Sequence, residues 1–225
     1  MMITTPITLK GNYCELLPLS HDHHDELVEA VNDGEFWKAW YTLVPSPEKM
    51  KSEIDRRLNL QDQGAMLPFS IKNSLTQKIV GMTSFLNIEV NHRRVEIGAT
   101  WIRKSCQRTG INTEAKLLLL THAFEKLNCI AVEFRTHFFN TQSKRGIEKL
   151  GAKPDGILRN HMIMPDNTLR DTCVYSIIAN EWDTVKTHLT PIFTAPLSVT
   201  IQPQFLVQIF RKNLYLSLNH TFLSS

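Results

Sequence analysis

The 225-residue sequence contains no apolar run that approaches the roughly 20 residues needed to cross a bilayer. Its amino terminus has neither the basic segment nor the apolar stretch of a secretory signal. The four cysteines are scattered, with no C-x-x-C pair and no zinc-ligand spacing, which is typical of reduced thiols in a cytosolic protein. We therefore expect a soluble, cytoplasmic protein with no membrane partner and no metal site.

A large excess of charge of one sign is also missing. The 25 Lys and Arg residues nearly balance the 22 Asp and Glu residues, which leaves a net charge of +3. The basic residues are dispersed without a clustered stripe, so nucleic acid is not an expected partner. An apolar fraction of 42% and a charged fraction of 21% indicate a folded globular chain rather than a disordered one.

The glycine-rich phosphate motifs are missing as well. No G-x-G-x-x-G segment occurs, so the dinucleotide fingerprint is excluded. The nearest approach to a P-loop is GIEKLGAK, where Ala152 separates Gly151 from Lys153 and no Ser or Thr follows. Because this segment follows a helix start, we interpret it as a helix stop.

What the sequence does contain is an alternation of strand and helix patterns. The strand–helix–strand section over residues 93–138 favours parallel pairing, and the three strands before it favour a meander. These patterns predict an α/β domain over residues 1–189, with a mixed sheet and flanking helices. Residues 190–225 form an apolar, proline-punctuated extension without a clear amphipathic period, so no element is predicted there. A strand-rich appendage, a dimerisation arm and a poorly packed extension all remain open. The predicted strands span residues 7–19, 66–72, 79–90, 93–102, 129–138, 157–164 and 169–178, and the predicted helices span 20–31, 47–61, 112–127 and 140–152.

The segment CQRTGINTEAK, residues 106–116, places a polar turn directly before an apolar helix. A helix start gathers unpaired backbone N–H groups at the positive end of the helix dipole, and it can bind phosphate there. Gly110 would let the backbone approach an anion closely, and Arg108 adds positive charge. The alternative is an ordinary helix start capped by Asn112 or Thr113. The residues alone leave both interpretations open.

Three segments together resemble one known family. Residues 93–120 resemble the acyl-coenzyme-A loop of the GNAT N-acetyltransferase superfamily, whose pattern is Q/R-x-x-G-x-G/A, with Asn112 in place of the final small residue. Residues 138–161 resemble the N-x-x-S…I-x-x-LGA…G-x-x-R segment of its RimJ/RimL-like branch, the ribosomal-protein N-terminal acetyltransferases. Residues 170–182 resemble the terminal strand and Glu-Trp ending of that branch. The resemblance spans about residues 7–189 and implies the GNAT fold, with a mixed, mostly antiparallel central sheet.

The resemblance also implies a reaction. The donor would be acetyl-CoA, and the acceptor would be a primary amine on a small molecule or a protein N-terminus, attacking directly in a ternary complex. A non-catalytic acyl-CoA-binding regulator is the alternative. Homodimers are common in this branch, so a homodimer is one expected assembly. The implied cofactor-binding residues are Trp101, Ile102, Gln107, Arg108, Thr109, Gly110, Ile111, Asn112, Thr113 and Asn140.

Two residues are candidates for proton transfer. Glu96, on the strand that leads to the loop, could take the proton of the amine. The alternative for Glu96 is a solvent-facing or salt-bridged strand residue beside Arg93 and Arg94. Ser143 matches the serine of N-x-x-S, and the resemblance implies that it lies near the sulfur as a proton donor or a partner of the thiol. Here the alternative is that Asn140 and Ser143 only begin a helix, one of them as its cap.

Three further features have competing interpretations. The branch often carries an acidic residue at the position of His137, which keeps the regulator alternative open and makes the histidine a candidate base. The segment HDHHD, residues 21–25, has a metal-binding spacing, but a solvated first helical turn is the expected structure. The aromatic segment FWKAWY, residues 36–41, either covers the acceptor site or packs a loop onto the core.

Overall fold

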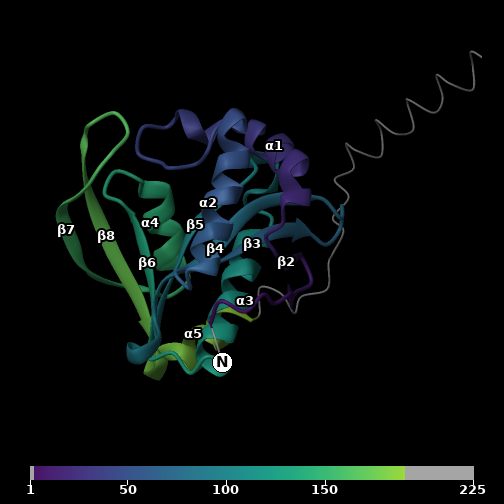
Figure 1. The fold of residues 1–225 in the computed structure, drawn as a ribbon. Coiled ribbons are helices and arrows are strands. Elements are labelled where there is room, and N and C mark those ends of the chain that lie inside the picture. Colours follow the sequence, from purple (N-terminus) through teal and green to yellow (C-terminus); the bar gives the residue numbers. More distant parts are fainter. Residues whose placement is uncertain (1–2, 191–225) are drawn as a thin grey trace, which may run out of the picture. The chain divides into compact units, whose positions relative to one another are not determined.

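The computed structural model describes residues 3–190 of the chain. Its strands form one eight-stranded sheet in the order β1-β2-β3-β4-β5-β6-β8-β7, in which only β5 and β6 pair in parallel. The predicted α/β class with a mostly antiparallel mixed sheet is therefore confirmed (Figure 1). The strands are β1 (Leu9–Lys10), β2 (Cys14–Pro18), β3 (Met66–Asn73), β4 (Ile79–Glu89), β5 (Arg94–Ile102), β6 (Ala131–His137), β7 (Lys153–Ile163) and β8 (Leu169–Ile178). The helices are α1 (His24–Asn32), α2 (Met50–Asp62), α3 (Ile111–Glu125), α4 (Thr141–Lys149) and α5 (Trp182–Leu189).

Two predictions about the elements are wrong. The single strand expected over residues 7–19 is a short hairpin, because the chain turns at Gly11, whose N–H donates to the carbonyl of Cys14 at 2.9 Å. Helix α5 was not expected at all. Its signal was present in the spacing of Trp182, Val185 and Leu189, which are all buried. The predicted extension over residues 190–225 lies outside the described residues except for Thr190, and it stays a prediction.

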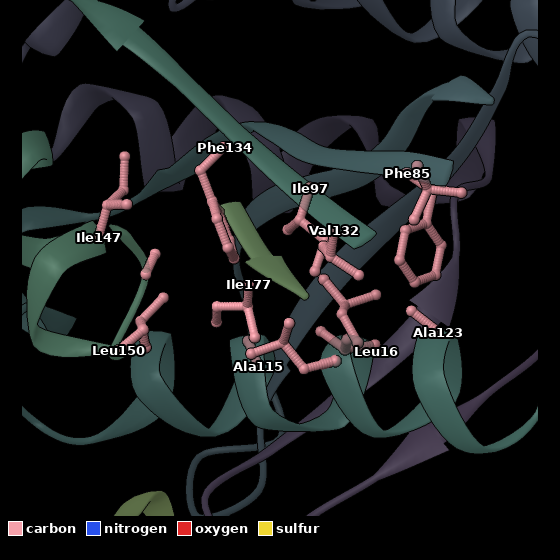
Figure 2. Packing of buried hydrophobic residues seen from close by; sticks show 14 of the residues in the cluster. Leu16, Phe85, Ile97, Ala115, Ala123, Val132, Phe134, Ile147, Leu150 and Ile177 are labelled. Carbon is pink, nitrogen blue, oxygen red and sulfur yellow. The ribbon is translucent and has the colours of Figure 1, made fainter. Parts of the chain in front are cut away.

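Two apolar clusters hold the helices against the sheet. The larger lies between the sheet and α3, where Ile97, Val132 and Phe134 of the strands face Ala115 of the helix (Figure 2). The smaller packs α1 and α2 against the opposite face, on Met82 and other residues of the central strands. In Figure 1, α1 and α2 accordingly lie on the other side of the sheet from α3. No helix among residues 3–190 is long and apolar enough to span a bilayer.

The buried face of α3 includes Leu119, Leu120 and Phe124. The other two leucines of the run, Leu117 and Leu118, are only partly buried. The helix also buries two charged side chains, Glu114 and Lys116. Charged residues are rarely buried unless they are paired or hydrogen-bonded, so each must have a partner in the structure.

Glu114 finds its partners in the backbone of the first hairpin. Its carboxylate accepts from the N–H groups of Asn12 at 2.8 Å, Tyr13 at 2.6 Å and Cys14 at 2.8 Å. A Cβ on Gly11 would lie 2.4 Å from the same carboxyl group, so a side chain at that position would displace the carboxylate from these hydrogen bonds. Glu114 thus fixes the amino-terminal hairpin to α3.

Replacing Glu114 with glutamine should therefore destabilise the fold. The amide nitrogen cannot accept, so at least one of the three N–H groups loses its partner and the remaining hydrogen bonds lose their charge. We expect the free energy of unfolding to fall by about 3 kcal/mol in urea denaturation. The same change at exposed Glu89 is the control and should alter it by less than about 0.5 kcal/mol. An equal loss in both variants would contradict the anchoring role of Glu114.

Candidate active site

The central sheet opens between β5 and β6. The two strands pair only over Arg94–Glu96 and Ala131–Glu133, whereas β6 continues against β8 as far as His137. On the β6 side, residues 97–102 of β5 therefore have no strand partner within the described part of the chain. We call residues 97–102 the free edge of β5. Trp101 and Ile102, expected to pair with an extended ligand chain, lie on this edge.

The free edge contains a β-bulge. The register with β4 shifts so that both Ala99 and Thr100 lie opposite Thr83, between the pairs Ser84–Gly98 and Met82–Trp101. Ala99 has a φ of 48°, in the left-handed region that non-glycine residues rarely adopt. The bulge turns peptide groups out of the regular ladder at this point of the edge.

The free edge leads into the turn that precedes α3. Gly110 is the N-cap residue of α3 with a φ of 91°, and Arg108 also has a positive φ of 63°. No side chain caps the helix, so the alternative of an Asn112 or Thr113 cap is wrong. Within the described residues, none of the backbone N–H groups from residue 108 to residue 113 donates to another group of the protein. Consecutive free N–H groups at a helix start form a site for an anion.

The start of the turn is fixed to the end of α1. Asp33 accepts from the N–H of Lys104 through its backbone carbonyl at 2.8 Å and pairs with Arg103 through its carboxylate at 2.9 Å. The hydroxyl of Ser105 donates to the same carboxylate, and this hydrogen bond, assisted by Arg103, lowers the pKa of Asp33. The turn is thus held at its first residues, while its later N–H groups have no partner among residues 3–190.

The start of α4 reaches the same turn. The side chain of Gln142 donates to that of Gln107 at 3.2 Å, which brings α4 next to the predicted cofactor loop. Asn140 is the N-cap residue of α4, and its side chain accepts from the N–H of Ser143 at 3.0 Å. The capping alternative therefore holds for Asn140. The hydroxyl of Ser143 has no partner among residues 3–190, so it can serve a ligand.

Glu96 lies where β5 and β6 begin to part. Its carboxylate is buried, accepts from Asn87 at 2.7 Å and pairs with Arg135 at 3.4 Å. A Cβ on Gly98 would lie 2.7 Å from this carboxylate, so Glu96 is directed along β5 towards the bulge. Burial raises the pKa of Glu96, and the charge of Arg135 opposes the shift. A buried carboxyl with a raised pKa suits a general base.

The solvent-facing alternative for Glu96 is wrong, because its side chain is buried. The salt-bridged alternative holds, with Arg135 of β6 as the partner, whereas the neighbouring Arg94 pairs with Glu133. The sequence offered no signal for Arg135, because the pairing depends on the parallel register of β5 with β6. Arg170 of β8 also acts on Glu96, favouring its charged form.

His137 ends β6 beneath the aromatic segment. Trp40 packs edge-on against its ring with the centroids 5.0 Å apart, and Phe139 contacts both rings. The N–H of Phe139 donates to Nδ1 of His137 at 3.1 Å, so the neutral ring carries its proton on Nε2. Burial lowers the pKa of His137, with a further contribution from Arg170, and Nε2 is buried without a partner among the described residues. The geometry favours a hydrogen-bond donor over a base.

The packing interpretation of the aromatic segment is confirmed at Trp37, and the covering of an acceptor site stays a prediction. Trp37 packs into the core against α1 and α2, whereas Trp40 and Tyr41 lie against His137. In the HDHHD segment, His24 pairs with Asp25 at 2.8 Å and His23 bonds Ser70 at 2.8 Å. No group of three potential metal ligands gathers among residues 3–190.

The open sheet, the bulge and the uncapped turn agree with a match to a known family. A family model described as the acetyltransferase (GNAT) domain matches residues 14–153. The chain therefore belongs to the GNAT acetyltransferase family, as its sequence predicted.

Two relatives from Bacillus subtilis (strain 168) make the comparison more specific. YdaF, whose name describes a ribosomal N-acetyltransferase, is 32% identical over 105 residues, which are 47% of this chain and 56% of YdaF. The match thus spans little more than half the length of YdaF. YoaA, named as an N-acetyltransferase, is 28% identical over 70% of this chain and 89% of its own length. The predicted likeness to the RimJ/RimL-like branch is confirmed.

Solved structures share the fold. An acetyltransferase structure from T. thermophilus is 29% identical, with a TM-score of 0.73 over 83% of this chain and 97% of its own. Mycobacterium smegmatis RimJ in complex with CoA-disulfide has a TM-score of 0.73 over 85% of this chain and 97% of its own. At 20% identity, RimJ supports the fold alone.

Proposed function

We propose that this chain transfers an acetyl group from acetyl-CoA to a primary amine that attacks directly in a ternary complex. The observation that carries the proposal is the row of free N–H groups over residues 108–113, placed at the end of the free edge of β5. This row suits the diphosphate of coenzyme A, and the free edge suits its extended arm. Membership of the GNAT acetyltransferase family agrees with this choice of ligand.

Acetyl-CoA supplies the acetyl group as a thioester, and the chain supplies the groups around it. The carboxylate of Glu96 accepts the proton that the amine nitrogen loses as it bonds to the carbonyl carbon. Peptide N–H groups on the free edge stabilise the negative oxygen that develops. The carbon–sulfur bond then breaks, and the hydroxyl of Ser143 gives a proton to the departing sulfur. Ser143 regains a proton from solvent and Glu96 releases one to solvent, so both groups return to their starting states.

We favour a protein N-terminus as the acceptor, because YdaF is named as a ribosomal N-acetyltransferase. Trp40, Tyr41 and the Nε2–H of His137 offer apolar contact and one hydrogen-bond donor for the first peptide group. A small-molecule amine would use the same site. An experiment on the proposed function must therefore compare peptide acceptors with small-molecule amines.

The test is release of free thiol from acetyl-CoA, measured with a panel of peptides bearing free N-termini and a panel of small amines. Acetylation of the peptide is checked by mass spectrometry. Turnover with a peptide supports the proposal, and turnover only with small amines changes the acceptor. Tight binding of acetyl-CoA without turnover on either panel would support the non-catalytic regulator instead.

Replacing Ser143 with alanine should lower turnover more than affinity. Without the hydroxyl the sulfur must leave as a thiolate or take its proton from water, so we expect kcat to fall roughly 10- to 100-fold. The dissociation constant of acetyl-CoA, measured by calorimetry, should change less than about threefold because the N–H groups of the turn are intact. Ser52→Ala, at the exposed start of α2, is the matched control. Equal kcat values in the two variants would remove Ser143 from the mechanism.

A further inference from the structure

The β-bulge on the free edge of β5 is held from both faces of the sheet by buried cations. On the α2 side, Arg57 donates to the carbonyl of Ala99 at 3.0 Å and to the hydroxyl of Ser84 at 3.2 Å. Its guanidinium is balanced by Glu53 at 2.7 Å on the same helix. Arg57 therefore fixes one peptide group of the bulge directly.

Lys116 of α3 reaches the bulge from the opposite face. Its Nζ donates to Oγ1 of Thr100 at 2.6 Å and lies 3.4 Å from Oγ1 of Thr83. The hydroxyl of Thr100 in turn donates to the carbonyl of Gly98 at 3.3 Å. The two threonine hydroxyls are 2.8 Å apart, so the Thr83 hydroxyl can donate to Thr100 while Thr100 donates to Gly98. A continuous chain of hydrogen bonds thus runs from Lys116 to the backbone next to Ala99.

Burying the Lys116 amine in the core lowers the stability of the folded protein. Lys116 is 7% exposed and forms no ion pair among the described residues, and its polar partners are two hydroxyls. Burial lowers the pKa of Lys116 to about 7, although the charge of Glu96 opposes the shift. Both the charged and the neutral amine carry hydrogens, so donation to Thr100 persists in either form. A leucine or methionine would fill the same space without this cost, so packing does not explain the lysine.

We propose that Lys116 is a positioning residue for acyl transfer, because it fixes the bulge over residues 98–100 through the hydroxyl of Thr100. The proposal rests on the proposed function, in which peptide groups of the free edge stabilise the developing negative oxygen. With Arg57 on one face and Lys116 on the other, these peptide groups cannot rotate out of position. Fixed dipoles of this kind need no rearrangement during the reaction.

The test uses Lys116→Met, Thr100→Val and a combined variant that carries both changes together with Thr83→Val, with Lys126→Met at the exposed end of α3 as control. Each single variant takes hydrogen bonds away from buried groups that remain, whereas the combined variant removes the amine and both hydroxyls. We therefore expect the urea midpoint to fall in the single variants and to recover in the combined variant. Thr100→Val and the combined variant should keep kcat roughly 10- to 100-fold below wild type, because the link to Gly98 is still missing.

Two readouts separate positioning from stability and from the proposed function. Hydrogen exchange of the amides over residues 97–102 should be faster in the combined variant despite its recovered urea midpoint. The dissociation constant of acetyl-CoA should change less than about threefold, because the turn is intact. If kcat and the slow hydrogen exchange of residues 97–102 both recovered together with the urea midpoint, the proposal would be overturned. Lys116 would then be a purely structural residue. Wild-type protein that binds no acetyl-CoA would instead refute the proposed function, while hydrogen exchange would still decide whether Lys116 fixes the bulge.

Discussion

Replacing Gly110 with tryptophan is expected to lower the affinity for acetyl-CoA by about 1,000-fold, which corresponds to about 4 kcal/mol of binding free energy. The glycine has a φ of 91°, which a residue with a side chain adopts only at a cost. The new side chain also covers the row of N–H groups over residues 108–113, and each lost hydrogen bond to a charged phosphate is worth about 1.5–3 kcal/mol. Two such losses account for the expected effect, which calorimetry with acetyl-CoA would measure.

Gly64 provides the control for this variant. It also has a positive φ, of 75°, and it lies just after α2 with open space around its Cα. Gly64→Trp therefore carries a similar backbone cost without touching the turn before α3. We expect both variants to lose some stability and only Gly110→Trp to lose binding. Retained affinity in a folded Gly110→Trp protein would contradict the anion site and, with it, the proposed function.

The turn illustrates what sequence reasoning could reach. Gly110 and the polar residues around it identified the place where an anion site could form, but the residues alone left a capped helix start equally open. The choice depends on whether the side chains of Asn112 and Thr113 turn back to the backbone, and in the structure neither does. The long strands, by contrast, follow from local periodicity, and the sequence predicted each of them in its correct order along the chain.

The buried charges illustrate what sequence reasoning missed. Nothing in the segment NTEAKLLLL shows that Glu114 and Lys116 enter the core, because each depends on a partner far away in the chain. Glu114 needs backbone N–H groups at residues 12–14, and Lys116 needs hydroxyls on β4 and β5. The leucine run hides the signal further, since an all-apolar segment has no clear face to predict. Such partners become visible only when the sheet register is known.

Glu96 gives the second large expected effect. Replacing it with glutamine keeps the shape and an acceptor for Asn87, but it removes the group that takes the proton of the amine. We expect kcat to fall by about 100- to 1,000-fold, with the dissociation constant of acetyl-CoA unchanged. The folded protein raises the pKa of Glu96, which means that the ionised form costs stability above that pKa. Glutamine removes this cost, so the urea midpoint at neutral pH should stay equal or rise.

The pH dependence of the rate then tests the role of Glu96 directly. A base must be ionised to accept a proton, so kcat/KM of the wild type should fall as the pH drops through the raised pKa of Glu96. We call this fall of kcat/KM at low pH the acidic limb of the profile. Arg135 lowers the pKa of Glu96, and therefore Arg135→Met should move the acidic limb to higher pH. In Glu96→Gln the limb should disappear along with most of the activity. A limb that stays in place in Arg135→Met would mean that another group is the base and that the buried carboxylate only orders the sheet where β5 and β6 part.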